Sequence, residues 1–340
     1  MRTIGLFLTF FIALRASPSY SVNDLGTLGA SSTIGFKIND AGMAVGWAET
    51  IYGYSQAFRS INGGALQTLS PLSASDSYAM AINNQGVIAG TAYVNGQPHG
   101  VIWNGSSITD LGAGFYANGI NDSGVVIGGN GHAFVLTNGV YHDLGVLPGG
   151  VWSSASGINN SGTVVGDSSL ASGNFRGFVW TPQSGMIELG TFGGLNSHAT
   201  GVNKSDEAIG FASLSSGYDH AFSATGAILT DLGTLGGSSY AYGINDSGVI
   251  VGYSWTASGD NPHAFVYLNG VMIDLNTLIP TNSGWILLEA YGINNAGQIV
   301  GEGLLNGQSH AFLLDPALGA LSIASVPEPG AVSLTAIGLG

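Results

Sequence analysis

The sequence contains no cysteine, so neither a disulfide framework nor a thiolate metal site can hold its fold together. Cationic side chains are also scarce: six lysines and arginines stand against twenty aspartates and glutamates, and the net charge is −14. Binding to nucleic acid or anionic lipid requires basic residues, so this composition argues against both partners. Charged residues make up only 8% of the chain and hydrophobic residues 45%, which argues against disorder.

The common catalytic signatures are missing as well. The sequence has no Gly-x-Ser-x-Gly elbow, no His-Glu-x-x-His helix and no phosphate-binding loop. Glycine-rich runs such as 128–131 do occur, but no helix follows them that could hold a phosphate. We therefore expect no catalytic residue and no cofactor.

What the chain does contain is one block of sequence repeated seven times. The Asn of an Ile-Asn or Val-Asn pair recurs at intervals of 44, 38, 38, 44, 42 and 49 residues, at Asn39, Asn83, Asn121, Asn159, Asn203, Asn245 and Asn294. A His-Ala-Phe triplet follows, with clear copies at His132, His220, His263 and His310 and weaker ones at Gln56, His99 and Arg176. An Asp-Leu-Gly triplet comes next, at Asp24, Asp110, Asp143, Glu188, Asp231 and Asp274 with small variations. Such self-similarity predicts a repeat fold.

Each unit has the pattern of four short strands, which we call a to d. Strand a ends at the Ile-Asn pair, and a tight Asn-Asp-Ser-Gly turn such as 245–248 leads into the apolar strand b. Strand c begins at the His-Ala-Phe triplet, and an Asn-Gly hairpin, as at 138–139 and 269–270, connects it to strand d. Four strands in a unit of this length are typical of a propeller blade.

The two ends of the repeated region are complementary. The chain begins with a lone strand d at 22–28, and its last unit stops after strand c at 310–314. The first strand can therefore complete the seventh blade and leave no sheet edge exposed. An open solenoid would need atypical capping repeats, which neither end shows. We predict an all-β, seven-bladed β-propeller of four-stranded blades over residues 22–316, with an open β-solenoid as the alternative.

The repeated triplet resembles that of the HAF-repeat family of bacterial extracellular proteins, over roughly residues 22–316. This resemblance implies export and a repeat fold, and it implies no defined reaction or ligand. Residues 1–21 agree with export, because Arg2 and an apolar run at 4–14, too short to span a bilayer, are typical of a signal peptide. A buried first strand is the alternative for this segment.

A linker is predicted at 317–326 and a sorting tail at 327–340. Val326, Pro327, Glu328 and Pro329, followed by an apolar stretch, resemble the PEP-CTERM sorting signal. That resemblance implies recognition by an exosortase and delivery to the surface of a Gram-negative-type bacterium or beyond. The family's signal has a longer apolar helix and a terminal Arg cluster, whereas here 11 residues follow Pro329, no Arg is among them, and the stretch is too short to span a bilayer. A chance proline-rich tail is the alternative.

Histidines and turn carboxylates are the obvious metal candidates. Five of the seven histidines share one repeat position, so in a ring they lie one to a blade, on the order of 10 Å or more apart. Zinc ligands must lie about 2 Å from the ion, so these histidines cannot share one. Each Asn-Asp-Ser-Gly turn offers at most one carboxylate, which is too few for calcium. We expect no metal site and interpret each His as the partner of the Asp on strand d.

Ligand binding is better sought in the loops that vary from blade to blade. The a–b and c–d turns on one face of the ring are short and similar, whereas the b–c and d–a connections on the other face vary and carry aromatic and acidic residues. The candidate binding residues are Trp47, Tyr52, Tyr54, Tyr218, Tyr240, Trp255 and Trp285, with Glu49, Asp167, Asp219, Asp260 and Glu302. Aromatic rings with polar neighbours suit sugars or peptides. The alternative is that these rings only cover the blade ends.

These patterns predict an exported, non-catalytic protein of the cell surface or extracellular matrix, acting as a binding or scaffold module. The expected ligand is an exopolysaccharide or surface glycan, because the acidic face would favour neutral glycans or cations over acidic polymers. The competing hypothesis is a secreted carbohydrate-active enzyme, a lyase or hydrolase, that uses loop carboxylates at the mouth of the ring.

Overall fold

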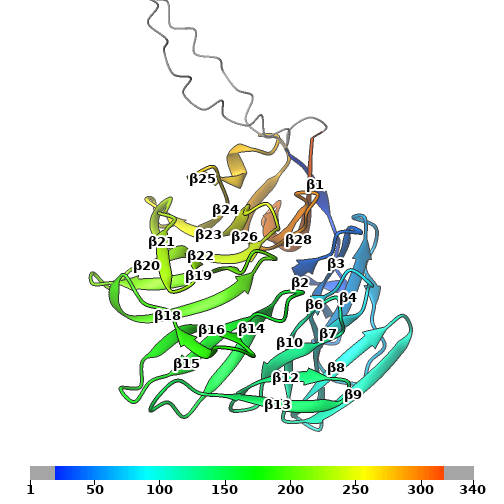
Figure 1. The fold of residues 1–340 in the computed structure, drawn as a ribbon. Helices are drawn as coiled ribbons and strands as arrows, with labels where there is room; N and C mark the ends of the chain where they lie inside the picture. Colours follow the sequence, from blue (N-terminus) through cyan, green and yellow to red (C-terminus); the bar gives the residue numbers. More distant parts are fainter. Residues whose placement is uncertain (1–19, 318–340) are drawn as a thin grey trace, which may run out of the picture.

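The computed structural model describes residues 20–317, which form seven four-stranded antiparallel sheets arranged as a ring (Figure 1). The all-β, seven-bladed propeller is therefore confirmed, and the solenoid alternative is wrong. The predicted sorting tail, including 326–329, lies outside the described residues, as does the predicted signal peptide except for its last two residues. Among residues 20–317, no helix is long and apolar enough to cross a membrane.

The blades follow one another in chain order, and each runs from strand a at the channel to strand d at the rim. Blade 1 consists of β2 (Gly29–Ile38), β3 (Met43–Thr50), β4 (Ser55–Ile61) and β5 (Gln67–Thr68), and blade 2 of β6 (Ser77–Ile82), β7 (Ile88–Val94), β8 (Gln97–Asn104) and β9 (Ser107–Ala113). Blade 3 consists of β10 (Tyr116–Ile120), β11 (Val126–Gly129), β12 (Ala133–Thr137) and β13 (Val140–Gly145), and blade 4 of β14 (Ser153–Ile158), β15 (Val164–Ser169), β16 (Phe175–Thr181) and β17 (Gly185–Glu188).

Blade 5 consists of β18 (Gly193–Val202), β19 (Glu207–Leu214), β20 (Asp219–Thr225) and β21 (Ile228–Asp231). Blade 6 consists of β22 (Gly236–Ile244), β23 (Ile250–Thr256), β24 (Pro262–Leu268) and β25 (Val271–Asp274), followed by a short 3-10 helix, η1 (Leu275–Thr277). Blade 7 consists of β26 (Trp285–Ile293), β27 (Ile299–Leu305), β28 (Gln308–Pro316) and, from the other end of the chain, β1 (Tyr20–Asp24).

The ring closes as predicted, through the N-terminal strand. β1 pairs antiparallel with β28 from Tyr20 opposite Pro316 to Asp24 opposite Phe312, and the two strands lie side by side in Figure 1. The strand begins at Tyr20, so Tyr20 and Ser21, which the prediction placed in the signal peptide, belong to the seventh blade. Tyr20 is buried in the core, and burial raises the pKa of its hydroxyl to about 12.

The repeated triplets turn out to be fold determinants. The Phe of the His-Ala-Phe triplet is fully buried in six blades, at Phe58, Phe134, Phe178, Phe222, Phe265 and Phe312. The triplet His pairs through Nδ1 with the Asp of Asp-Leu-Gly in five blades, at 2.7–3.0 Å. The same carboxylate caps the turn that follows, as when Asp231 accepts the N–H of Gly233 at 2.8 Å. The structural interpretation of these histidines is confirmed, and in blade 4 Arg176 and Glu188 replace the pair at 3.2 Å.

A β-bulge near the end of every strand a shapes the channel. The residue after the bulge is glycine in five blades, because the inner strands of adjacent blades touch there. A Cβ on Gly243 would lie 2.9 Å from Val251 and 3.2 Å from the Cα of Gly292 in the next blade. Blade 2 has Ala81 at this position, and blade 1 has Lys37. Lys37 is therefore the one long side chain at a position where the fold favours almost none.

Candidate functional site

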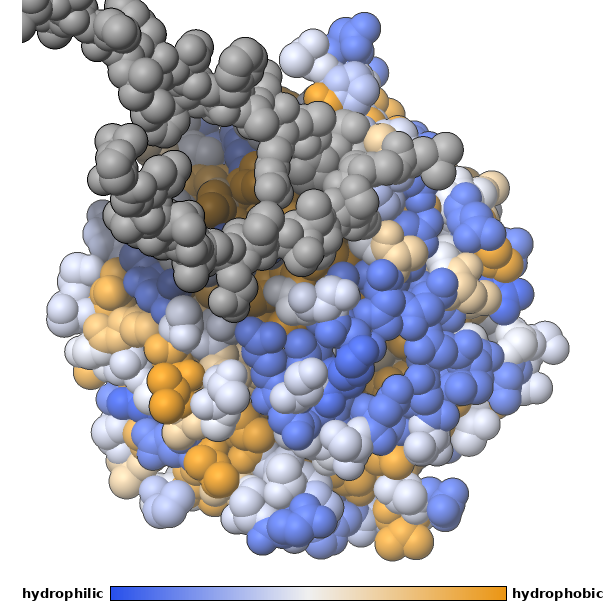
Figure 2. Space-filling model, turned by 45° about the horizontal axis from the view of Figure 1, so that its top comes forward, coloured by the Kyte–Doolittle hydropathy of each residue, from blue (hydrophilic) through white to orange (hydrophobic). Residues whose placement is uncertain are grey.

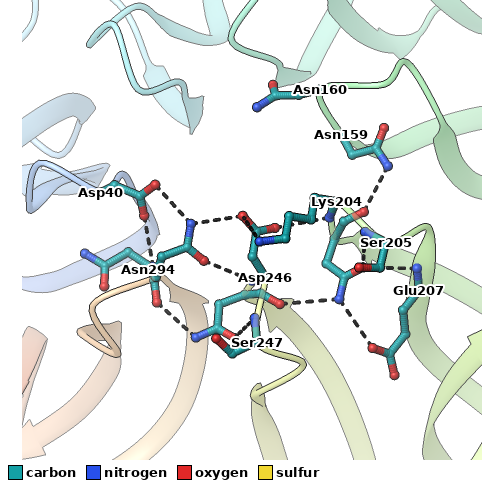
Figure 3. Close-up of polar contacts among 12 residues, drawn as sticks. Asp40, Asn159, Asn160, Lys204, Ser205, Glu207, Asp246, Ser247 and Asn294 are labelled. Atoms are coloured by element: carbon teal, nitrogen blue, oxygen red, sulfur yellow. Dashed lines mark hydrogen bonds and ion pairs between the residues drawn. The ribbon is translucent and has the colours of Figure 1, made fainter. Parts of the chain in front are cut away.

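A ring of asparagines surrounds the a–b mouth of the channel, and Figure 3 shows the part of it that includes Asn159 and Asn294. The seven Asn residues of the repeat are buried, and each Nδ2 donates to the backbone carbonyl of the equivalent Asn in the next blade, at 2.9–3.4 Å. Each Oδ1 accepts the N–H four residues further on, at 2.9–3.1 Å. The sequence predicted the turn that these residues form but not the links between blades.

A second collar surrounds this ring and a cavity of about 230 Å³. Six of its seven members alternate between carboxylate and amide and the seventh is a lysine, in the order Asp40, Asn84, Asp122, Asn160, Lys204, Asp246 and Asn295. Each of its carboxylates accepts hydrogen bonds from a neighbouring amide side chain and a neighbouring backbone N–H; Asp40, for example, accepts both from Asn295. The carboxylates of the collar are thus engaged in holding the blades together.

Because the ring has seven blades, the alternation of carboxylate and amide must fail once. It fails between Asn160 and Lys204, where the next residue of the collar is a lysine instead of a carboxylate. Blade 5 compensates with Asp206, which stands at φ 60° where the turns of the other blades have glycine. Its carboxylate accepts hydrogen bonds from Asn159 at 2.8 Å and from the Thr163 hydroxyl at 2.7 Å, both in blade 4. The bond from Thr163 is the main cause that lowers the pKa of Asp206.

Above the collar, the channel holds a cavity of about 260 Å³. Strand-a residues line it, one or two from each blade: Phe36, Lys37, Met80, Asn118, Ser156, Thr200, Tyr242 and Tyr291. The Nζ of Lys37 reaches across the blades and donates to the carbonyls of Tyr242 at 3.0 Å and Tyr291 at 3.2 Å. Burial of this ammonium group lowers its pKa to about 8. Sequence reasoning missed Lys37, although the signal was present as a lysine at a Gly or Ala position of the repeat.

Aromatic rings pack against one another through blades 4 to 6, and one of them, Tyr242, also lines the channel cavity. Seven rings from blades 4 to 6 follow one another with centroid separations of 4.8–5.8 Å, in the order Trp152, Phe175, His198, Phe211, Tyr240, Tyr253 and Tyr242. We call this set the aromatic arc. The Nδ1 of His198 also lies 3.4 Å from the carboxylate of Asp167. The sequence analysis selected only Tyr240 and Asp167 here, because it searched loops and most of the arc lies within strands.

The predicted aromatic residues fall into two groups. Tyr52, Tyr54, Tyr218 and Trp255 lie at the b–c ends of three blades, with 79%, 50%, 59% and 39% of their surfaces exposed. Trp47, Tyr240 and Trp285 belong to strands: Trp47 contacts Tyr78 edge-on at 5.8 Å, Tyr240 is part of the arc, and Trp285 packs edge-on against Phe312 at 6.2 Å. The structure thus leaves the rings of the first group free on the b–c face and places those of the second in blade packing.

The predicted acidic residues are also divided. Asp260 is exposed in the β23–β24 loop, and Glu49 is half-buried in β3. Asp219 accepts hydrogen bonds from Ser213 Oγ at 2.7 Å and from the Tyr240 hydroxyl at 3.3 Å, and Glu302 accepts one from Ser309 Oγ at 2.6 Å. Within residues 20–317, no three His, Asp or Glu side chains gather closely enough to hold a metal ion.

Two carboxylates face each other in blade 7, and only one of them was predicted from the sequence. Glu302 on β27 stands directly opposite Glu289 on β26, and sequence reasoning had selected only Glu302. Burial raises the pKa of Glu289, the charge of Glu302 raises it further, and a hydrogen bond donated by the Tyr291 hydroxyl acts in the opposite direction. Because strand a and strand b side chains meet only in the folded blade, no sequence spacing announced this pair.

The side of the molecule that Figure 2 presents shows no single large apolar patch on its visible surface. Figure 2 shows that hydrophobic residues on the side it presents occur in small separate groups among hydrophilic ones. The exposed large hydrophobic residues are distributed over six of the seven blades, all except blade 2, from Ile51 in blade 1 to Ile286 in blade 7. Such scattered residues are normal for a protein surface.

Comparison with known proteins supports the fold and nothing finer. No family model and no curated protein matches the chain. Similar solved structures include YCF48 bound to D1 peptide, with a TM-score of 0.54 at 11% identity over 93% of this chain and 99% of that one. A puromycin-hydrolysing peptidase from Mycobacterium tuberculosis gives 0.50 at 11% identity over 85% and 53%. TolB from Acinetobacter baumannii gives 0.45 at 10% identity over 81% and 64%, so this chain spans less than two thirds of TolB. At these identities the chain is shown to share the β-propeller fold, and its resemblance to HAF-repeat and PEP-CTERM proteins stays a prediction.

Proposed function

We propose that this protein is an exported, non-catalytic binding module that holds a glycan chain against the b–c face of the ring. The observation that carries the proposal is the pair Tyr218 and Trp255, which stand exposed at the b–c ends of adjacent blades 5 and 6. Exposed aromatic rings with polar neighbours stack on the apolar faces of sugars. The b–c connections are also longest in blades 1, 4, 5 and 6, whereas blades 2 and 7 have two-residue hairpins.

The charge of this face favours a neutral glycan. Asp219 directly follows Tyr218, and Asp260 lies in the loop that follows Trp255. Asp167 lies next to His198 of the aromatic arc. Arg176, at the start of strand c in blade 4, is already paired with Glu188. A negative mouth with its nearest arginine engaged repels acidic polymers and tolerates neutral ones.

The proposed address is the bacterial surface or matrix. Support for it comes from the sequence: the signal-peptide features of 1–21, the resemblance to HAF-repeat proteins and the PEP-CTERM-like motif at 326–329, which would make an exosortase a partner. Fractionation of cells that express the intact chain or a chain without 327–329 tests the motif. Different distributions of the two chains are expected, and identical distributions would exclude a working sorting signal.

The binding face is tested with a glycan array, using wild type beside a Tyr218→Ala, Trp255→Ala double variant. Stacking contributes about 0.5–1.5 kcal/mol per aromatic contact, so loss of two contacts should weaken binding roughly five- to hundredfold. Ile228→Ala is the matched control, because Ile228 is 76% exposed next to the c–d turn on the opposite face. Equal binding by wild type and the double variant, or no glycan bound at all, would remove this face from consideration.

A peptide array run in parallel gives the competing ligand a fair test. The YCF48 structure holds a D1 peptide, and aromatic rings on a propeller face suit peptides as well as sugars. Binding of peptides alone, lost in the double variant, would keep the face and replace the ligand class.

The enzyme hypothesis has one observation in its favour, the Glu289–Glu302 pair. Glycosidases use two carboxyl groups, one of which is kept protonated by a raised pKa, and burial raises the pKa of Glu289. A screen of polysaccharides for hydrolysis or lyase products, with Glu289→Gln and Glu302→Gln variants, separates the two functions. Turnover that either substitution abolishes would establish an enzyme and overturn the non-catalytic proposal.

A further inference from the structure

We propose that the cavity around Lys37 inside the channel binds a small organic acid with a single aromatic or apolar ring, whose carboxylate pairs with the Lys37 ammonium group. This site lies apart from the glycan face and needs none of its exposed rings. The inference rests on three features of the channel: an uncompensated ammonium group, a cavity of suitable size and lining, and a departure from the repeat that the fold does not require.

The ammonium group of Lys37 has no anionic partner. Its Nζ donates to two backbone carbonyls, which leaves one N–H free, and within residues 20–317 no carboxylate oxygen lies within 4 Å of it. The titratable residues that line the cavity with Lys37 are Tyr242 and Tyr291, and the Tyr291 hydroxyl donates a hydrogen bond to the carboxyl of Glu289. Lys37 is half-buried in the channel, and an ammonium group that is partly shielded from water and has no counterion destabilises the fold; an entering carboxylate would offset that penalty.

The cavity around this group has a size and lining suited to a small ligand. Its volume of about 260 Å³ lies just below the usual range for drug-sized molecules and accommodates a one-ring acid. Phe36, Met80 and the rings of Tyr242 and Tyr291 form an apolar wall beside the lysine. Asn118, Ser156 and Thr200 bring polar groups from blades 3, 4 and 5 to the opposite side. An apolar lining with a few convergent polar groups is typical of ligand sites.

The repeat shows that the lysine is not needed to build a blade. The equivalent residues are Ala81, Gly119, Gly157, Gly201, Gly243 and Gly292, and all six blades form the same bulge with them. A purely structural role, in which Lys37 ties blade 1 to blades 6 and 7, would explain the two hydrogen bonds but neither the adjoining cavity nor the missing counterion. The experiment must therefore distinguish a bridging lysine from a binding one.

The chain has only two lysines, Lys37 and Lys204, so labelling with [13Cε]lysine gives one resonance for each. Benzoate is the probe and neutral, isosteric benzamide its matched control. We expect benzoate to shift the Lys37 resonance saturably, to raise the pKa of its ammonium group, and to bind at least tenfold more tightly than benzamide. The resonance of Lys204, exposed in the collar, should not move.

Three outcomes would overturn the proposal: no effect of benzoate on the Lys37 resonance, equal binding of benzamide, or unchanged benzoate binding by a folded Lys37→Met variant. If Lys37→Met fails to fold, the comparison of benzoate with benzamide on the wild-type protein still decides. Benzoate binding should persist in the Tyr218→Ala, Trp255→Ala variant. Failure of the glycan proposal and failure of this one are therefore separate results.

Discussion

Replacing Asn121 by aspartate should break one link of the asparagine ring while leaving its turn intact. The Oδ1 of Asn121 accepts the N–H groups of Ser123 and Val125 at 3.0 Å, and an aspartate oxygen can accept both. The Nδ2 donates to the carbonyl of Asn159 in the next blade at 3.1 Å, and here aspartate presents a second oxygen instead of a donor. The substitution therefore keeps the turn, removes the bond between blades 3 and 4, and places a carboxylate oxygen against the Asn159 carbonyl at a buried site.

The size of the effect follows from burial. A hydrogen bond of this kind contributes about 1 kcal/mol, and leaving a buried carbonyl without its donor costs about 1–3 kcal/mol more. We expect Asn121→Asp to lower the free energy of unfolding by about 2–4 kcal/mol at pH 7. In a domain of about 300 residues that corresponds to a fall in Tm of roughly 3–6 °C.

Urea unfolding followed by circular dichroism measures this difference. Asn95→Asp is the matched control, because it makes the same change of charge at an exposed position in the β7–β8 hairpin. Asn95 has a φ of 51°, a conformation that aspartate tolerates. It should stay within about 0.5 kcal/mol of wild type. If Asn121→Asp were as stable as Asn95→Asp, the asparagine ring would be a by-product of turn geometry and would not hold the blades together.

Three further perturbations address closure, the blade interfaces and pH. Deletion of 20–24 should lower the Tm strongly by exposing the edge of β28, and unchanged melting would contradict closure by this strand. Thr33→Val should raise the free energy of unfolding by about 1 kcal/mol, because the buried Thr33 hydroxyl has no hydrogen-bond partner. Ser239→Ala should lower it by about 1–2 kcal/mol, because the Ser239 hydroxyl accepts from Ala221 N at 2.8 Å and donates to Gly233 O at 2.6 Å. A urea titration that gave the reverse order of stabilities would refute this account. Asp206→Asn should destabilise the protein at pH 7 but progressively less in acid. The pKa of Asp206 is lowered in the folded state, so its carboxylate contributes stability that is present above about pH 4 and is lost as the pH falls. If the unfolding midpoints of wild type and variant differed by the same amount at every pH, the carboxylate charge would not be involved.

The fold could be predicted from the sequence because its information is repeated seven times. The Ile-Asn pair, the His-Ala-Phe triplet and the Asp-Leu-Gly triplet each mark one strand or turn, and their fixed order gave the blade. The complementary ends gave the closure, which β1 and β28 confirm. Even the pairing of His263 with Asp274 could be anticipated, because neighbouring strands c and d bring the two residues together.

These side-chain clusters could not be predicted in the same way, because they are set by contacts between strands and between blades. Glu289 faces Glu302 across two strands, and His198 stacks between Phe175 and Phe211 from two blades. No local spacing encodes these neighbours. The binding residues were predicted from the loops, so most of the aromatic arc was not among them, because its rings lie mostly on strands.

Departures from the repeat therefore carry information that the repeat itself cannot. A position occupied by the same residue in every blade serves the blade, and a position that breaks the pattern must be explained by something outside it. Asp206 is explained by the odd number of blades: the alternating collar has to fail once, and this carboxylate supplies the missing link to Thr163. Lys37 has no such explanation, because the other blades form the bulge with glycine or alanine and, among residues 20–317, no carboxylate oxygen lies within 4 Å of its Nζ. A departure from the repeat whose polar groups are satisfied by neighbouring blades, such as Asp206, is structural. A departure that leaves a charge without a partner beside a cavity, such as Lys37, is the better place to look for a ligand.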